Sequence, residues 1–272
     1  VSGTISALTN NGMGVAGIAP LAKILPLKGL NDQGYGESAW LAEALVYAKS
    51  LGAQVINNSW GPGSQKPSNP VVEEAVRFAY DRGQGALVVF AAGNSDDDVT
   101  FYSPQNMRET LTVASVDHLG EKSSFSNYGD GLKIAAPGGE GGASCSDLQI
   151  QSILSLRAGN ADLYAVCGAA WEGQMVVSGS YYRARGTSMA SPHAAGVGAL
   201  IASRFPLDRA AQIKLRMMGG AATFNSPPQV PLGAGIVNAN RAFNFAQPAA
   251  EITDHELLST DGYVRPQVDT PL

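Results

Sequence analysis

The sequence is poor in histidine, cysteine and charge, and each shortage narrows what the protein can be. Its 272 residues include three histidines and two cysteines, and charged residues make up 15% of the chain. The net charge is −5 and no block of the chain is basic, so nucleic acid and anionic membrane surfaces are excluded as expected partners. No apolar run approaches the roughly 20 residues that a membrane-spanning helix needs. With 44% hydrophobic residues, the chain can bury a full core as one large domain.

The two cysteines, Cys145 and Cys167, do not form a metal-binding pattern. They lie in one polar segment rich in Gly and Ser, and no second Cys or His pair accompanies them. The 32 glycines and the few charges are typical of a loop-rich secreted enzyme, so we expect an extracellular protein. In an oxidising compartment the two cysteines would close a disulfide loop, which stabilises by about 3 kcal/mol on the chain-entropy model. Two free thiols are the alternative.

The order of the predicted elements indicates an α/β fold with a mostly parallel sheet. The continuous apolar run over residues 86–92 is typical of a strand buried on both faces. Strands alternate with helices whose ends are marked by Gly and Pro. The predicted strands are 23–28, 54–59, 86–92, 110–116 and 132–136, and the predicted helices are 1–8, 37–51, 70–82, 208–218 and 238–245. In the helix over 37–51 we expect one buried face, formed by Trp40, Leu41, Ala44, Leu45, Ala48 and Leu51.

Residues 186–193 read Gly-Thr-Ser-Met-Ala-Ser-Pro-His and introduce a run of small residues typical of a closely packed helix. Ser188 would lie at the helix N-terminus, where unpaired N–H groups and the helix dipole stabilise negative charge. Pro192 fits the first helical turn, and the costly helix glycines Gly196 and Gly198 indicate close contact with a neighbour. A capped structural helix is the alternative, since serine is a common N-cap.

Ligands of α/β sheets gather beyond the carboxyl ends of the strands, which directs attention to residues 59–61, 93–95 and 137–139. The buried strand at 86–92 runs directly into Gly93 and Asn94. A neutral, fixed amide at this place can donate to an oxygen that becomes negative when a nucleophile attacks a carbonyl. An ordinary turn is the alternative, because Gly-Asn pairs commonly form turns.

These motifs, in this chain order, resemble those of the subtilisin-like serine proteases, and the resemblance covers roughly residues 1–245. It implies a three-layer α/β fold with helices on both faces of a mostly parallel sheet. It also implies that Ser188 is the nucleophile and that Asn94 stabilises the oxyanion. An extended polypeptide substrate would bind between two segments: Gly34, Tyr35 and Gly36 on one side, and Ser59, Trp60 and Gly61 on the other. Trp60 departs from the smaller aliphatic residue that is usual there.

The same resemblance sets the expected domain and its partners. We expect a peptidase domain over residues 1–246 and a tail or linker over 247–272, where the chain is polar and punctuated by proline. The expected partners are polypeptide substrates, with a prodomain as a further candidate, and we expect a monomer. Three aspartates follow Asn94 at 96–98 and could favour a basic substrate residue, although a solvated acidic loop is the weightier interpretation.

The chemistry requires no cofactor, but the resemblance implies a structural calcium site as a hypothesis. Residues 9–14 resemble the family's calcium loop, in which backbone and amide oxygens, here including those of Asn10 and Asn11, are suitable hard ligands. That site generally also draws on an upstream acidic residue, and no such residue precedes the loop in this chain.

The missing component is a general base. A serine hydroxyl needs an adjacent base, which is itself oriented by an acid. His118, His193 and His255 do not match the family's catalytic histidine motif, and the resemblance makes His193 structural. The chain opens on Val1 rather than Met, and residues 1–4 resemble the continuation of that motif. We therefore expect the catalytic Asp and His, and the N-terminal strands, before Val1, and this chain alone to be inactive.

Two other functions compete with a serine endopeptidase. An α/β-hydrolase has its catalytic residues in the chain order serine, acid, histidine, and Ser188, Asp254 and His255 occur in that order. That fold also requires a Gly-x-Ser-x-Gly pattern, and Ala190 stands where its last glycine should be. A non-catalytic pseudoprotease or peptide-binding module would keep the same fold and cleft without the triad. Intact Ser188 and Asn94 favour the enzyme, because a binding module has no chemical need of either.

Overall fold

The computed structural model describes residues 1–141, 151–158 and 176–246. The predicted disulfide partners Cys145 and Cys167 lie outside the described residues, as does the predicted tail over 247–272. His255 lies in that tail. The domain boundary and the disulfide therefore stay predictions.

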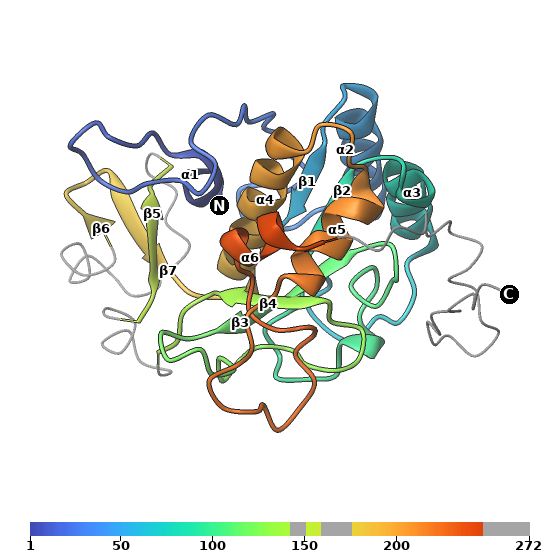
Figure 1. Cartoon of the computed structure of the whole chain (residues 1–272). Helices are drawn as coiled ribbons and strands as arrows, with labels where there is room; N and C mark the ends of the chain where they lie inside the picture. Colours follow the sequence, from blue (N-terminus) through green and yellow to red (C-terminus); the bar gives the residue numbers. More distant parts are fainter. Residues whose placement is uncertain (142–150, 159–175, 247–272) are drawn as a thin grey trace, which may run out of the picture.

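A four-stranded parallel sheet forms the centre of the molecule (Figure 1). Its strands are β1 (Val55–Asn58), β2 (Leu87–Ala91), β3 (Leu111–Val116) and β4 (Ile134–Pro137), in the order β1-β2-β3-β4. Every residue of β2 and β3 is buried. The continuous apolar run therefore predicted the central strand correctly, because both faces of a parallel sheet are covered by helices.

Helices pack on the sheet in two groups (Figure 1). The long α4 (Thr187–Arg204) contacts all four strands, and α1 (Ser2–Ser6), α5 (Ala210–Gly219) and α6 (Ala239–Asn244) pack against it. The second group is α2 (Ser38–Ser50) with α3 (Pro70–Tyr80), and α3 contacts β2. The predicted α/β architecture is confirmed, with element ends shifted by a few residues.

The small residues of α4 allow it to lie directly on the sheet. A Cβ added to Gly198 would come within 2.8 Å of Leu87 on β2, and one added to Gly196 would come within 2.8 Å of Ile18. The predicted close contact of both glycines is confirmed. Because the helix lies so near the strands, its N-terminus is held at the carboxyl ends of β1 and β2.

The strand predicted over residues 23–28 is wrong. No strand forms there, and Ile24, Leu25 and Leu27 are 37–45% exposed. A strand is stabilised by the hydrogen bonds of a neighbouring strand, and none in the described parts of the chain pairs with this segment. Pro26 also removes one backbone donor. Alternating hydrophobicity alone was therefore insufficient.

The buried face of α2 is narrower than predicted. Leu41, Leu45 and Ala48 are buried, whereas Trp40 and Leu51 are each 55% exposed, so these two assignments were wrong. The helix packs mainly against α3, and this contact covers only the central stripe of the face. Trp40 instead borders a small surface pocket with residues 28–33.

A small antiparallel sheet was not predicted. It contains β5 (Ile153–Leu156), β7 (Tyr181–Ala184) and β6 (Val176–Val177), in the order β5-β7-β6. It supports α1, because Gly3 packs on Leu156 and Thr4 Oγ1 donates to Ser155 Oγ at 3.3 Å. The surrounding sequence is rich in Gly and Ser and carries no clear strand period.

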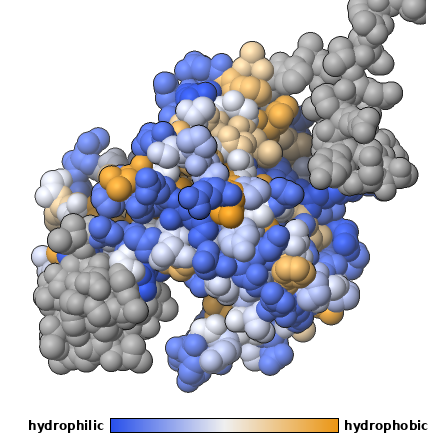
Figure 2. Space-filling view, turned by 90° about the horizontal axis from the view of Figure 1, so that it is seen from below, coloured by the Kyte–Doolittle hydropathy of each residue, from blue (hydrophilic) through white to orange (hydrophobic). Residues whose placement is uncertain are grey.

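The surface in Figure 2 is mostly hydrophilic, and its hydrophobic residues form small separate groups. Within the described residues, every helix is too short or too polar to cross a membrane.

Candidate active site

Ser188 is the second residue of α4, as predicted for a helix N-terminus. Its side chain is half-buried, and its hydroxyl donates to the Ser59 carbonyl at 3.1 Å. The backbone N–H of Ser188 finds no acceptor within residues 1–141, 151–158 and 176–246. An unpaired N–H in the first turn of a helix, with the helix dipole behind it, favours a negative oxygen beside Ser188.

Asn94 is held beside this turn by Thr187. The Thr187 backbone N–H and hydroxyl both donate to Asn94 Oδ1, at 2.9 and 2.8 Å, and the same hydroxyl accepts from the Gly93 N–H at 3.1 Å. Because an N–H can donate only to the amide oxygen, these contacts fix which end of the amide faces α4. The Nδ2 donor is left for another acceptor. It lies 3.4 Å from where a Cβ of Gly186 would be.

Asn127 organises the loop that carries Asn94. Its buried side chain accepts from the N–H groups of Ser95 and Asp97 at 2.9 and 3.3 Å, and donates to the Ala92 carbonyl at 3.0 Å. A single asparagine between turn residues gave no signal in the sequence. Its role depends on the contact of two segments that are far apart along the chain.

Ser59 connects the end of β1 to Ser188. The Ser59 hydroxyl donates to the Ser188 carbonyl at 2.9 Å and accepts from Asn57 Nδ2 at 2.9 Å. Asn57 Oδ1 accepts in turn from the Ser191 hydroxyl at 2.6 Å. The structure therefore brings the predicted residue Ser59 against the predicted nucleophile. Asn57 and Ser191, which were not predicted, complete the connection.

Phe90 and Gln105 hold Trp60 and Gly61 in place. The Trp60 ring packs edge-on against Phe90 with centroids 4.9 Å apart, so this large side chain belongs to the core at the end of the sheet. Gln105 Nε2 donates to the Trp60 carbonyl at 3.0 Å. The Gln105 side chain lies so close to Gly61 that an added Cβ would come within 2.4 Å of Nε2.

The segment with Gly34, Tyr35 and Gly36 forms a self-closed loop on the surface. Asn31 Oδ1 accepts from the N–H groups of Gln33 and Tyr35 at 3.0 and 2.9 Å, and the Tyr35 side chain is 74% exposed. Leu30 and Trp60 pack on the same hydrophobic core cluster, so this cluster supports both predicted cleft segments. Their contact with a substrate stays a prediction.

Neither of the described histidines, His118 and His193, forms a hydrogen bond with the Ser188 hydroxyl. His193 Nδ1 donates to the Met189 carbonyl at 2.8 Å, one turn back along the same helix. Burial lowers the pKa of His193 below its ordinary value, against the opposing hydrogen bond to Met189. His118 lies exposed in the turn after β3. His193 thus supports α4, in line with the structural role that the resemblance implies.

Pro192 lies deeper in α4 than predicted. The helix begins at Thr187, so Pro192 is its sixth residue and lies past the first turn. A proline there removes the N–H that would bond the carbonyl four residues earlier, which is that of Ser188. The carbonyl is bonded instead by the Ser59 hydroxyl.

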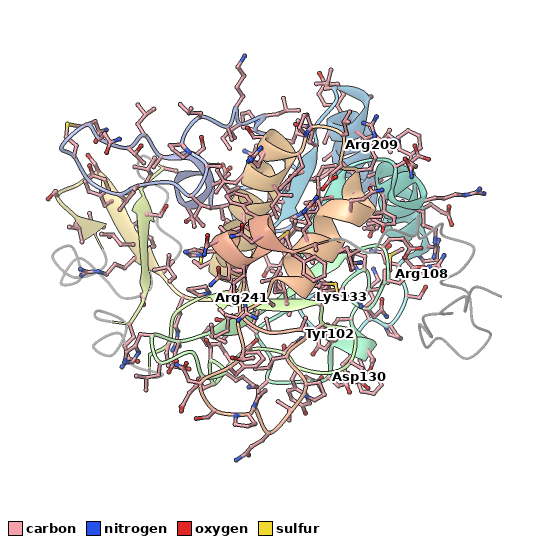
Figure 3. The ribbon with its side chains drawn as sticks, viewed as in Figure 1. Tyr102, Arg108, Asp130, Lys133, Arg209 and Arg241 are labelled. Atoms are coloured by element: carbon pink, nitrogen blue, oxygen red, sulfur yellow. The ribbon has the colours of Figure 1, made fainter. Side chains whose placement is uncertain are left out.

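The acidic loop after Asn94 is bonded within the chain. Asp96 pairs with Lys122 at 2.6 Å, and Asp98 caps the short helix that follows it. Hydrogen bonds from Gln65, the Asp98 backbone and Tyr102 lower the pKa of Asp97 (Tyr102 is labelled in Figure 3). These partners favour the interpretation of a structural loop over selection of a basic substrate residue.

The calcium site suggested at Asn10 and Asn11 stays a prediction. Asn11 Oδ1 accepts from the Met13 N–H at 3.0 Å, which closes the loop on itself. No group of three acidic, histidine or cysteine side chains comes together anywhere in the described part of the chain. Residues 9–14 themselves offer calcium only backbone, amide and hydroxyl oxygens.

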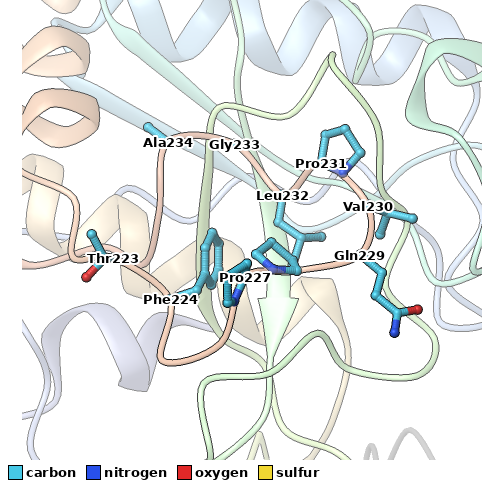
Figure 4. Close-up of a pocket in the computed structure, with 10 residues that line it drawn as sticks. Thr223, Phe224, Pro227, Gln229, Val230, Pro231, Leu232, Gly233 and Ala234 are labelled. Atoms are coloured by element: carbon cyan, nitrogen blue, oxygen red, sulfur yellow. The ribbon is translucent and has the colours of Figure 1, made fainter.

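A pocket of about 570 Å³ lies in the loop over residues 223–234 (Figure 4). Its walls include Phe224, Leu232 and three prolines. None of the site residues described above lines it. This hollow is separate from the chemistry at Ser188.

Comparisons with known proteins agree with the fold described above. The profile of the Subtilase family matches residues 1–249. The thermophilic serine proteinase of Bacillus sp. (strain AK1) is 35% identical over 204 residues, which are 75% of this chain and 42% of that protein. The extracellular protease of Xanthomonas campestris pv. campestris is 35% identical over 257 residues, which are 90% of this chain and 39% of that protein. The chain thus spans about two fifths of the length of these relatives.

A solved structure extends the likeness to three dimensions. A protease from Pseudoalteromonas arctica PAMC 21717 superposes with a TM-score of 0.76 at 32% identity, covering 89% of this chain and 68% of that one. The chain belongs to the subtilase family.

Proposed function

We propose that the chain carries the nucleophile and oxyanion side of a serine endopeptidase. The observation that supports this most strongly is the double hydrogen bond from Thr187 to Asn94 Oδ1, which leaves Nδ2 as a fixed donor beside Ser188. A preorganised neutral donor is useful where negative charge develops on a carbonyl oxygen, and a purely structural turn has no need of it.

In the proposed reaction, Ser188 Oγ attacks the carbonyl carbon of a peptide bond while a base removes the hydroxyl proton. The carbonyl oxygen becomes negative and accepts from Asn94 Nδ2 and the Ser188 backbone N–H. Collapse of this intermediate breaks the C–N bond, and the base returns its proton to the leaving amine. Water then hydrolyses the acyl group from Ser188 by the same sequence of steps.

The base and its orienting acid are proposed to come from residues upstream of Val1. In the described residues the Ser188 hydroxyl donates to a neutral carbonyl, which does not activate it as a nucleophile. We therefore expect the chain alone not to hydrolyse peptides at protease rates. Turnover at such rates that Ser188→Ala abolishes, with no other fragment present, would contradict this part of the proposal.

The proposed substrates are extended polypeptides that pair with the backbone of Ser59, Trp60 and Gly61 and run past Gly34, Tyr35 and Gly36. The extracellular name of one relative supports a secreted protein. A prodomain partner and a monomeric state complete the proposal.

A pseudoprotease with the same cleft is the second candidate, favoured by the engagement of the Ser188 hydroxyl with Ser59. A peptidyl boronic acid distinguishes the two functions, because near neutral pH its free boron is mostly trigonal and becomes tetrahedral and negative when Ser188 Oγ bonds to it and the hydroxyl proton leaves to the buffer. In near-neutral buffer, ¹¹B NMR is expected to show a tetrahedral boron that disappears in Ser188→Ala. Binding with a trigonal boron would support the pseudoprotease, and no binding would overturn both.

A further inference from the structure

The helix that carries Ser188 has a gap in its hydrogen-bond ladder. In an α-helix the carbonyl of residue i accepts from the N–H of residue i+4. For Ser188 that residue is Pro192, which has no N–H. A buried carbonyl without a donor destabilises a protein, so a donor from outside the helix is required at this position.

Ser59 supplies the missing donor. Its hydroxyl lies 2.9 Å from the Ser188 carbonyl, although the two residues are 129 positions apart. The Ser59 carbonyl also accepts from the Ser188 hydroxyl at 3.1 Å. Ser59 therefore contacts both the backbone and the reactive oxygen of Ser188: its hydroxyl donates to the Ser188 carbonyl, and its backbone carbonyl accepts from the Ser188 hydroxyl.

Asn57 fixes the direction of the Ser59 hydroxyl. A serine hydroxyl can donate or accept, and it rotates to suit its surroundings. Asn57 Nδ2 donates to Ser59 Oγ at 2.9 Å, so the Ser59 hydrogen is left to point at Ser188. Because the Ser188 carbonyl can only accept, the Ser59 hydrogen is used there, so the Asn57 atom that faces Ser59 Oγ must be the Nδ2 donor. The fully buried Ser191 hydroxyl donates to Asn57 Oδ1 at 2.6 Å.

The same arrangement sets the distance between nucleophile and oxyanion donor. Asn57 lies on β1 and pairs in register with Val89 on β2, the strand that leads to Asn94. Thr187 ties α4 to Asn94, and Asn57 with Ser59 ties α4 to β1. The first turns of α4 are therefore fixed to two neighbouring strands at once.

We propose that Asn57 is a positioning residue for Ser188, acting through Ser59 to supply the hydrogen bond that Pro192 removes from the helix. The inference rests on the proposed function only for its consequence in catalysis. The hydrogen bond itself is independent of any activity.

One NMR signal reports this hydrogen bond directly. Ser188-Met189 is the only Ser-Met pair in the sequence, so labelling serine carbonyls with ¹³C and methionine with ¹⁵N gives a single carbonyl-to-amide correlation. Asn57→Asp keeps an acceptor for Ser191 but replaces the donor to Ser59 with a carboxylate. The Ser188 carbonyl shift is expected to move upfield in Asn57→Asp and in Ser59→Ala, because a lost hydrogen bond shields the carbonyl carbon.

Pro192→Ala provides the rescue. It restores an N–H four residues after Ser188, so the Ser188 carbonyl shift in Ser59→Ala/Pro192→Ala is expected to return toward the wild-type value. A general structural defect would add to the effect of Ser59→Ala instead of reversing it. Asn106→Asp is the matched control, because the Asn106 side chain donates to the carbonyls of Pro67 and Thr100, which lie outside this arrangement.

The boronic acid measures the consequence for the nucleophile. Asn57→Asp is expected to weaken the tetrahedral adduct about fivefold to tenfold, the equivalent of one net hydrogen bond. Binding of the matching peptide carboxamide, which forms no bond to Ser188, is expected to stay unchanged. A Ser188 carbonyl shift that does not move in Asn57→Asp overturns the inference. A shift that moves while wild type forms no tetrahedral adduct overturns the proposed function and leaves the positioning of Ser188 standing.

Discussion

Thr187→Val tests how strongly the oxyanion donor is tied to the nucleophile helix. Thr187 is fully buried, and its hydroxyl both donates to Asn94 Oδ1 and accepts from the Gly93 N–H. Valine keeps the shape of the side chain but makes neither hydrogen bond. The Gly93 N–H is then left without an acceptor, and Asn94 keeps only the backbone donor of Thr187.

The expected loss of stability follows from these two contacts. A partly buried N–H without an acceptor costs about 1–3 kcal/mol, and the second hydrogen bond contributes about 1 kcal/mol net. Burying a methyl group in place of a hydroxyl offsets about 1 kcal/mol of this. We therefore expect Thr187→Val to lower the free energy of unfolding by about 2 kcal/mol.

Urea denaturation of the two proteins, with the slope m compared as a check on the unfolded state, measures this difference. Thr187→Ser is the control, because it keeps the hydroxyl and loses only a buried methyl, about 1 kcal/mol. The side-chain amide resonance of Asn94 is expected to shift in Thr187→Val and to stay in place in Thr187→Ser. A valine variant as stable as wild type, with an unmoved Asn94 amide, would refute the reasoning.

Three further predictions address packing, pH and metal. Gly198→Ala is expected to lower the free energy of unfolding by about 1–2 kcal/mol in urea, because the clash with Leu87 outweighs the gain of about 1 kcal/mol in helix propensity. Because burial lowers the pKa of His193, the unfolded chain binds more protons as the pH falls through about 6.5, and stability is lost there. His193→Gln is expected to lose less stability than wild type between about pH 7.5 and pH 5. Chelation of calcium is expected to leave the melting temperature of this chain unchanged, and a drop would show that the chain binds the ion.

The sequence predicted best those parts of the fold whose signal is local. The strand at 86–92 and the helix after Ser188 were predicted because composition and period within a single segment determine them. The segment 23–28 has the same alternation as a strand, but a strand also needs a neighbour, and pairing depends on residues elsewhere in the chain. The prediction of the buried face of α2 was wrong for a similar reason, because the exposure of the Trp40 side chain depends on how much of it α3 covers.

In the candidate site, too, the residues with a local sequence signal were predicted and those that depend on distant contacts were not. Ser188 and Asn94 were predicted because each belongs to a short motif in a fixed chain order. Thr187 lay within the motif but its two contacts were not foreseen, and Asn57 carried no signal at all. Its importance arises from Pro192, 135 residues away, which removes a donor that Ser59 replaces when Asn57 on β1 lies beside it. Polar contacts between distant segments are the part that a single sequence does not reveal.

Hydrolysis of a fluorogenic peptide tests the central claim most directly, measured for this chain and for the longer chain that includes the residues preceding Val1. The account predicts background rates for this chain. For the longer chain it predicts turnover that Ser188→Ala abolishes and that Asn94→Ala lowers by about 10²–10³-fold, the magnitude known for loss of the corresponding donor in subtilisin. Turnover of the longer chain that survives Ser188→Ala, or protease rates from this chain alone, would contradict the account.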